Sequence, residues 1–520
     1  MINHPRRKVL ALCLDGYEHS LGEEMTRAGE MPALARLRAR SARFLLDHGL
    51  AVRTGLASEH VATGLAPDAA RRWAAVHFDP ARYAAWQEGT GIAPFPSRLR
   101  ARTVVFDPPY FALDRCPAVL GVVNWGAHDP GVACGSQPPG LLAELNQRFG
   151  PYPAKEWLYG VAWQSPDRAR EMGQSLARAA SLRAQVAVWL LTERIPDWDL
   201  ALVTVSEPHS AIEGLWHGID RSHPLHLLPS AAISGDGVRA VYRAVDALVG
   251  ALTDALPETT VVLFAMHGMG SNRSDVASML LLPELLYRRS FGEALFEAPP
   301  EARATPSRMP LLGPRQSWSE WVRSCFGPTR CSGVVADARL DSLPWMPAAW
   351  YAPYWKDMEC FALPSFYDGR IRVNLQGRER DGRVPIGEYE AFCDRVETLL
   401  RGCIDPRTGE SVVEAVERPA GRDPLRLDAT ESDLVVVWRG APPALQHPEF
   451  GLVGPAPYRR PGGHTGLNGF AWLSGTGIKP GEMGRASSFD VVPTLIDFLG
   501  ESVRPDISGR SLFDGTVTIN

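Results

Sequence analysis

The chain has 520 residues, and its 54 Lys and Arg against 59 Asp and Glu give a formal net charge of −5. This charge excludes a globally basic nucleic-acid-binding protein, so no nucleic-acid polymer is expected as a partner. With 45% hydrophobic and 22% charged residues, the composition is that of a chain that folds around a large core.

The cysteines and the N-terminal region predict a cytoplasmic location. The eight cysteines include no C-x-x-C pair and are too sparse for a disulfide framework, which favours a reducing compartment. The apolar run Val9–Leu14 is shorter than the roughly 7–15 residues of a signal-peptide core. No apolar run approaches the roughly 18 residues of a membrane-spanning helix, so no membrane association is expected.

Strongly apolar runs alternate with amphipathic segments along the first half of the chain. Three runs have the composition of buried parallel strands: Val9–Leu14, Leu200–Val205 and Thr260–Ala265. Three segments carry apolar residues at helical spacings of three and four: residues 32–45, 172–193 and 238–252. The order of these elements predicts an α/β fold with a mostly parallel sheet sandwiched between helices.

The composition and periodicity of the sequence change after the third strand. These changes predict three segments. Residues 1–285 form the predicted α/β core. Residues 286–360 are rich in Pro, Arg and Trp, show little periodicity and are predicted to be an insertion or cap. Residues 361–520 are predicted to be a small α+β C-terminal portion that completes the core. Its expected elements are strands near residues 370–375, 433–438 and 470–473 and helices near 388–400 and 490–500.

Each apolar strand is followed closely by polar residues that can bind metal. Asp15 follows the first strand, His209 lies just after the second, and His267 lies just after the third. In open α/β sheets, ligands gather beyond the carboxyl ends of the strands. The three side chains are therefore expected to face one crevice.

His209, Glu213 and His217 are spaced four apart after the second strand. On a helix they lie roughly on one face, where a His and a Glu four apart can bind one divalent ion. The alternative is a solvated polar segment, and Asp15 and His267 taken singly also fit a turn and loop packing. Assembled together, however, Asp, Glu and unprotonated His are costly unless a cation neutralises them.

Several segments, taken in order, resemble the alkaline phosphatase superfamily, in particular its type I phosphodiesterase/nucleotide pyrophosphatase branch. They are L-C-L-D-G with E-M-P-A-L-A-R-L near the N-terminus, T-G-L-A-P, V-T-V-S-E-P-H, L-F-A-M-H-G-M-G, G-G-H-T-G and the terminal D-V-V-P-T-L-I-D-F-L-G. The resemblance runs from residue 9 to about 500 and is weakest across 286–360. It implies an alkaline phosphatase-like fold.

The resemblance also implies a nucleophile and two metal sites. In the family, a nucleophilic Thr or Ser stands nine residues before T-G-x-x-P, and counting back from Thr63 gives Thr54, with Ser58 as the competing hydroxyl. The implied ligands of the first metal are His209, Glu213 and His464. Those of the second are Asp15, Thr54 and His267.

This chain departs from the commoner family pattern at both metal sites. Met266 stands where most members have Asp, and its thioether is a poor ligand for a hard divalent ion. His209 and Glu213 stand where members usually have Asp and then His. If the match is shifted by four residues, Glu213 and His217 take these positions instead, so His217 is a further candidate. The expected cofactor is one or two divalent ions, with zinc as the first choice and manganese as an alternative.

Two further segments resemble those of one bacterial subgroup of these proteins. In R-I-R-V-N-L-Q-G-R-E-R, Arg372 and Arg378 are candidate ligands of an anionic substrate, although ordinary salt bridges on a surface strand are the favoured explanation. In V-N-W-G-A-H-D, His128 and Asp129 are candidates to reach the crevice, with loop packing as the favoured explanation.

These observations predict a metal-dependent hydrolase of phosphoesters. The expected substrate is a small anionic ester of the phosphodiester or pyrophosphate type, attacked by Thr54 to give a covalent intermediate. The alternatives are a group transferase on the same scaffold and, because of Met266, a non-catalytic binding member with a degraded second metal site. The sequence leaves the oligomeric state open.

Overall fold

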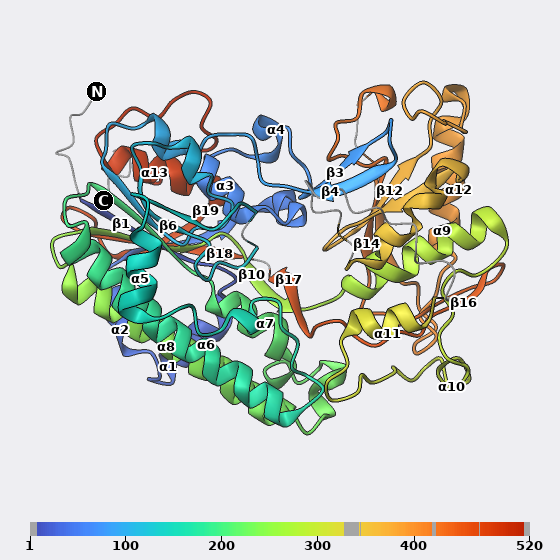
Figure 1. Ribbon diagram of the computed structural model, residues 1–520, viewed down its shortest axis with the longest axis horizontal. Helices are drawn as coiled ribbons and strands as arrows, with labels where there is room; N and C mark the ends of the chain where they lie inside the picture. Colours follow the sequence, from blue (N-terminus) through green and yellow to red (C-terminus); the bar gives the residue numbers. More distant parts are fainter. Residues whose placement is uncertain are drawn as a thin grey trace.

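The computed structural model describes residues 8–129, 131–326, 343, 345–418, 423–466 and 468–513, and its largest element is a nine-stranded sheet (Figure 1). The strand order is β19-β2-β18-β9-β1-β8-β5-β6-β7. Strands β9, β1, β8, β5 and β6 are mutually parallel, whereas β7 and β18 run antiparallel to their neighbours. The bounds are β1 (Val9–Leu14), β2 (Ala42–Asp47), β5 (Thr103–Phe106), β6 (Leu120–Val123), β7 (Gly135–Gln137), β8 (Leu200–Val205), β9 (Thr260–Ala265), β18 (Gly469–Ser474) and β19 (Gly481–Ser487).

Helices cover both faces of this sheet (Figure 1). Leu10, Leu12 and Leu14 of β1 share one hydrophobic cluster with α1 (His19–Arg27), α2 (Pro32–Ala39), α5 (Leu141–Phe149), α6 (Pro166–Trp189), α7 (Glu207–Leu215) and α8 (Ala231–Ala255). The alternate residues of β1 point to the other face and pack with α3 (Ala57–Thr63) and α13 (Val491–Phe498). The predicted helix-covered, mostly parallel α/β sheet is confirmed.

A second lobe lies beside the main sheet and has its own hydrophobic cluster, built mainly from residues between 276 and 458 (Figure 1). Its antiparallel sheet has the order β11-β12-β14-β13, with β11 (Cys360–Leu363), β12 (Gly369–Val373), β14 (Leu434–Trp438) and β13 (Val413–Glu417). The other elements are α9 (Leu282–Phe291), α10 (Pro300–Arg303), α11 (Trp318–Ser324), α12 (Tyr389–Arg401), β15 (Leu445–His447), β16 (Gly451–Val453) and the hairpin β3–β4 (Val76–Asp79, Ala84–Gln87). The short α4 (Pro67–Ala70) precedes this hairpin.

The described residues of the predicted cap pack in the same cluster as much of the segment after residue 361. Residues 327–342 and 344 of that cap, including Cys331, lie outside the described residues. The boundaries at 285 and 360 stay a prediction. Among the helices that the structure describes, none is both long enough and apolar enough to cross a bilayer.

One predicted helix is wrong in its second half. The helix expected over residues 32–45 ends at Ala39, and Phe44 and Leu45 belong to β2 instead. The Ser41 hydroxyl donates to the Leu37 carbonyl at 2.6 Å near this helix end. Strand β2 then pairs with both β18 and β19. These contacts with distant segments outweigh the helical spacing of the apolar residues in this segment.

A buried ion pair ties α6 to two loops at the carboxyl end of the sheet. The guanidinium of Arg183 is fully buried and lies 2.8 Å from Asp107 and 2.9 Å from Glu207. Glu207 begins α7, and Asp107 follows β5 and accepts hydrogen bonds from the backbone N–H groups of Trp125 and Gly126. Arg183 therefore positions both α7 and the loop after β6.

Replacing Arg183 by Met should lower the free energy of unfolding by about 3–5 kcal/mol, because two buried carboxylates lose their cation. Equilibrium urea unfolding measures the change. Arg170→Met on the same helix is the control, since Arg170 is half exposed and pairs with Asp167, and it should change stability by less than about 0.5 kcal/mol. A loss below about 1 kcal/mol for Arg183→Met would contradict the role assigned to this ion pair.

Candidate active site

The carboxyl ends of the adjacent strands β9, β1 and β8 position four of the predicted site residues. Asp15 directly follows β1, and His267 follows β9 after one residue. The chain leaves β8 into α7, which carries His209 and Glu213 one turn apart. The structure therefore places these side chains at one edge of the sheet.

A two-stranded ribbon brings in the fifth residue from far along the sequence. Strand β10 (Gly268–Ser271) pairs antiparallel with β17 (Gly462–Gly466), which carries His464. The pairing needs glycine, because a Cβ on Gly466 would lie 2.2 Å from the carbonyl carbon of Gly268. His464 thereby reaches His267, which directly precedes the ribbon.

The side chains of these residues lie in contact with one another. His464 Nε2 is 2.9 Å from His209 Nε2, and His464 Nδ1 is 3.2 Å from His267 Nε2. His209 Nε2 is 3.5 Å from Glu213 Oε1, and His209 Nδ1 is 3.0 Å from Asp15 Oδ2. The five residues Asp15, His209, Glu213, His267 and His464 thus form one buried cluster, called here the histidine cluster.

The protonation states of the histidine cluster suit a metal ion. Burial lowers the pKa of His464 well below its ordinary value and also lowers that of His267, so both imidazoles are held in the neutral, ligating form. Burial alone would raise the pKa of Asp15, but the nearby His209 holds it below its ordinary value. His209, Glu213 and His464 offer ligand atoms within 4.8 Å of one another, as do His128, Asp129 and His209. The donor set therefore fits a divalent cation.

Thr54 lies on a segment that borders the histidine cluster at both ends. It is the last residue of the 3-10 turn Gly49–Thr54, which follows His48, whose ring lies 5.9 Å from that of His267. Gly55, directly after it, packs against Tyr367, whose ring lies 4.5 Å from that of His464. The buried Thr54 hydroxyl donates to the Ala51 carbonyl at 2.7 Å and accepts from the Leu56 N–H.

Three other candidates have their described partners elsewhere. His217 Nε2 faces the hydroxyls of Ser230 and Ser234 at 3.1 and 3.3 Å. Arg372 bonds Glu379, and Arg378 bonds Glu379 and Asp433, inside the second lobe. The structure does not bring these three residues to the histidine cluster, and the roles of all the candidates stay predictions.

Met266 packs in the hydrophobic cluster on the α3 and α13 face of the sheet. It lies next to His267 in sequence but offers no oxygen to the site. The strand end where the resemblance implies a carboxylate is therefore apolar in this chain.

A pair of arginines that no motif had predicted lies beside the cluster. Arg460 contacts Glu213 and also bonds Asp275 at 2.7 Å, and Arg459 bonds the same carboxylate at 2.7 Å. Both residues stand just before G-G-H-T-G, so their position next to a metal-site motif was the available signal.

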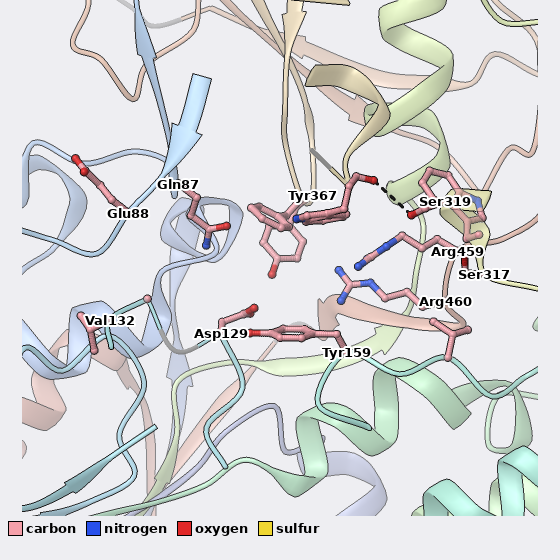
Figure 2. Close-up of a pocket in the computed structure, with 15 residues that line it drawn as sticks. Gln87, Glu88, Asp129, Val132, Tyr159, Ser317, Ser319, Tyr367, Arg459 and Arg460 are labelled. Carbon is pink, nitrogen blue, oxygen red and sulfur yellow. Dashed lines mark hydrogen bonds between the residues drawn. The ribbon is translucent and has the colours of Figure 1, made fainter. Parts of the chain in front are cut away.

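A cavity of about 590 Å³ opens beside the cluster. Arg459, Arg460 and Asp129 extend into it, and the rings of Tyr159 and Tyr367 flank it (Figure 2). Trp318, Trp345 and Phe366 complete an aromatic lining. The cavity thus combines cationic and aromatic side chains.

The family model for type I phosphodiesterase / nucleotide pyrophosphatase matches residues 9–324. The chain belongs to this family. The predicted resemblance and the prediction of a phosphodiesterase-like hydrolase are thereby confirmed at the level of the family.

One solved structure supports the architecture, and a second is reported for comparison. Phosphonoacetate hydrolase from Sinorhizobium meliloti 1021, in complex with phosphonoformate, is 15% identical over 95% of this chain and 97% of that chain, with a TM-score of 0.53. Murine ectonucleotide pyrophosphatase / phosphodiesterase 5, as an inactive variant in complex with AMP, is 10% identical over 97% of each chain, with a TM-score of 0.47. No curated protein matches the sequence.

His217 is buried away from the histidine cluster, and its burial predicts an effect on the stability of the protein in acid. Burial lowers the pKa of His217 to about 3, well below the ordinary value of the unfolded chain. The unfolded state therefore binds the extra proton between about pH 6.5 and 3, and stability falls as the pH falls through this window. His217→Gln should make the fall shallower by up to about 1.4 kcal/mol per pH unit, measured by urea unfolding between pH 7 and 4.5. An unchanged slope would mean that His217 does not contribute to the acid sensitivity.

Proposed function

We propose that this protein hydrolyses a phosphodiester or pyrophosphate-type substrate, with Thr54 as nucleophile and a divalent metal as cofactor. Membership of the family supports the hydrolase class. The metal part of the proposal rests on His209, Glu213 and His464, whose ligand atoms converge within 4.8 Å. Two imidazoles and one carboxylate are a usual zinc set that leaves one position for water or substrate, so zinc is proposed first and manganese second.

Asp15, Thr54 and His267 are proposed to hold a second ion. Asp15 and His267 belong to the histidine cluster, and Thr54 lies on the segment that borders it. The second set lacks the ligand that Met266 replaces, and Met266 packs among apolar residues. The second ion is therefore expected to bind more weakly than the first, or not at all.

The proposed reaction proceeds through a covalent intermediate on Thr54. When bound, the metal would lower the pKa of the hydroxyl and stabilise charge on the attacking and leaving oxygens. Thr54 Oγ1 gives up its proton to water and forms a bond to phosphorus while the bond from phosphorus to the leaving oxygen breaks, and the leaving group takes up a proton from water. Water then attacks phosphorus, which releases the product and restores the Thr54 hydroxyl. The Leu56 N–H, 3.1 Å from Thr54 Oγ1, orients the nucleophile.

The cavity supports a small anionic substrate. Arg459 and Arg460 present guanidinium groups that suit phosphoryl oxygens. The surrounding Trp318, Trp345 and Phe366 offer ring faces to a flat or apolar group on the other side of the ester. A phosphodiester with an aromatic substituent fits both halves of this lining.

Thr54→Ala should reduce the turnover of an aryl phosphodiester by at least about a thousandfold, because the nucleophilic oxygen is lost. Thr54→Ser keeps the hydroxyl and should retain a measurable part of the activity. The measurement is kcat/KM with the protein loaded with zinc, or with manganese in a parallel series.

Ser58→Ala is the matched control for the competing hydroxyl and should remain active. If Ser58→Ala is inactive and Thr54→Ala remains active, Ser58 and not Thr54 is the nucleophile. A wild-type protein that binds no divalent metal and turns over no phosphoester would contradict the proposed function and favour a binding role.

A further inference from the structure

His128 lies against the histidine cluster on the loop that follows β6. Its imidazole stacks on that of His209 with ring centroids 3.8 Å apart and an interplanar angle of 24°. Asp107 holds this loop through the N–H groups of Trp125 and Gly126. The position of His128 is thus fixed by the same ion pair that positions α7.

Ser210 contacts the Nδ1 edge of the His128 ring. The Ser210 hydroxyl oxygen is 3.1 Å from His128 Nδ1 and 3.2 Å from the Leu158 carbonyl. Because this contact occupies Nδ1, Nε2 is the ring nitrogen that is left for the histidine cluster.

That nitrogen faces carboxylate oxygens. His128 Nε2 is buried and has no hydrogen-bond partner among the described residues, and it lies 3.3 Å from Glu213 Oε2 and 3.7 Å from Asp129 Oδ2. His128, Asp129 and His209 offer ligand atoms within 4.8 Å of one another. A cation between the nitrogen and the two carboxylates would satisfy all three groups, and 3.3 Å is a spacing that two ligands of one ion adopt.

We propose that His128 binds the metal ion of this cluster through Nε2, beside Glu213 and His209, with Asp129 as an adjacent oxygen ligand. The inference rests on the proposed function, because it concerns the same metal centre. It adds a ligand from a third loop to the set that the motifs imply. Asp129 also lines the cavity, so the added ligands place the ion on the side from which substrate enters.

The zinc dissociation constant of the full-length protein tests this assignment. In competition with a chromophoric chelator, His128→Gln should bind zinc at least about tenfold more weakly than wild type. His223→Gln also removes a buried imidazole, but one whose described contacts lie near Tyr458 and His217, and it should match wild type within about twofold. Equal affinities in wild type and His128→Gln would overturn the proposal.

A second variant and a spectroscopic measurement guard against a folding artefact. Ser210→Ala removes the hydroxyl that contacts His128 Nδ1 and orients the ring, and it should weaken zinc binding by a smaller factor. The visible spectrum of the cobalt(II)-substituted protein should change in His128→Gln and stay unchanged in His223→Gln. Wild-type affinity in Ser210→Ala together with an unchanged cobalt spectrum in His128→Gln would also overturn the proposal.

The outcomes separate this inference from the proposed function. If wild type binds metal and needs Thr54 for turnover while His128→Gln binds zinc as tightly, the assignment of His128 fails alone. If wild type binds neither zinc nor cobalt, the metal-dependent function fails and the assignment fails with it.

Discussion

The candidate site depends on the buried guanidinium of Arg183. Arg183 lies on α6, beneath the sheet, yet it compensates the charges of Glu207 at the start of α7 and of Asp107 after β5. This cation, together with the N–H groups that donate to Asp107, compensates two fully buried carboxylates. The same contacts determine where His209 and Glu213 leave the sheet and where the loop bearing His128 lies. Stability and ligand geometry are therefore coupled through one residue that touches no ligand atom.

The histidine cluster brings together several hydrogen-bond acceptors, and this is possible because the backbone segments that carry them approach closely at glycine residues. Gly16 has a φ of +62°, and a Cβ on it would lie 2.6 Å from His209. The glycines of the β10–β17 ribbon allow His464 to reach His267 in the same way. Such packing places imidazole nitrogens and carboxylates against one another, an arrangement that a cation stabilises. Arg460 supplies part of that positive charge on the cavity side.

The sequence predicts a helix or strand correctly where a single hydrophobic pattern runs through the whole element. It predicts wrongly where contacts with distant segments determine the conformation. Strands β1, β8 and β9 are buried on both faces, so continuous apolar runs give their bounds. The helix expected to include Phe44 ends early because residues 42–47 pair as β2 with two neighbouring strands. Salt bridges on a surface strand were the favoured explanation for Arg372 and Arg378. The salt bridges are present, but the surface location is wrong, because β12 is buried and Arg372 is only 1% exposed. Arg460 and the orientation of His128 depend on tertiary contacts that no spacing in the sequence encodes.

Two departures from the pattern that the family resemblance implies change the charges around the cluster. Met266 is apolar and stands at the end of β9, beside His267. On α7 the imidazole of His209 lies against Asp15, and the carboxylate stands one turn along the helix, at Glu213, where it meets His128 and Arg460. Arg460 therefore compensates part of the Glu213 charge on the cavity side. A divalent ion bound by Glu213 would share this carboxylate with Arg460.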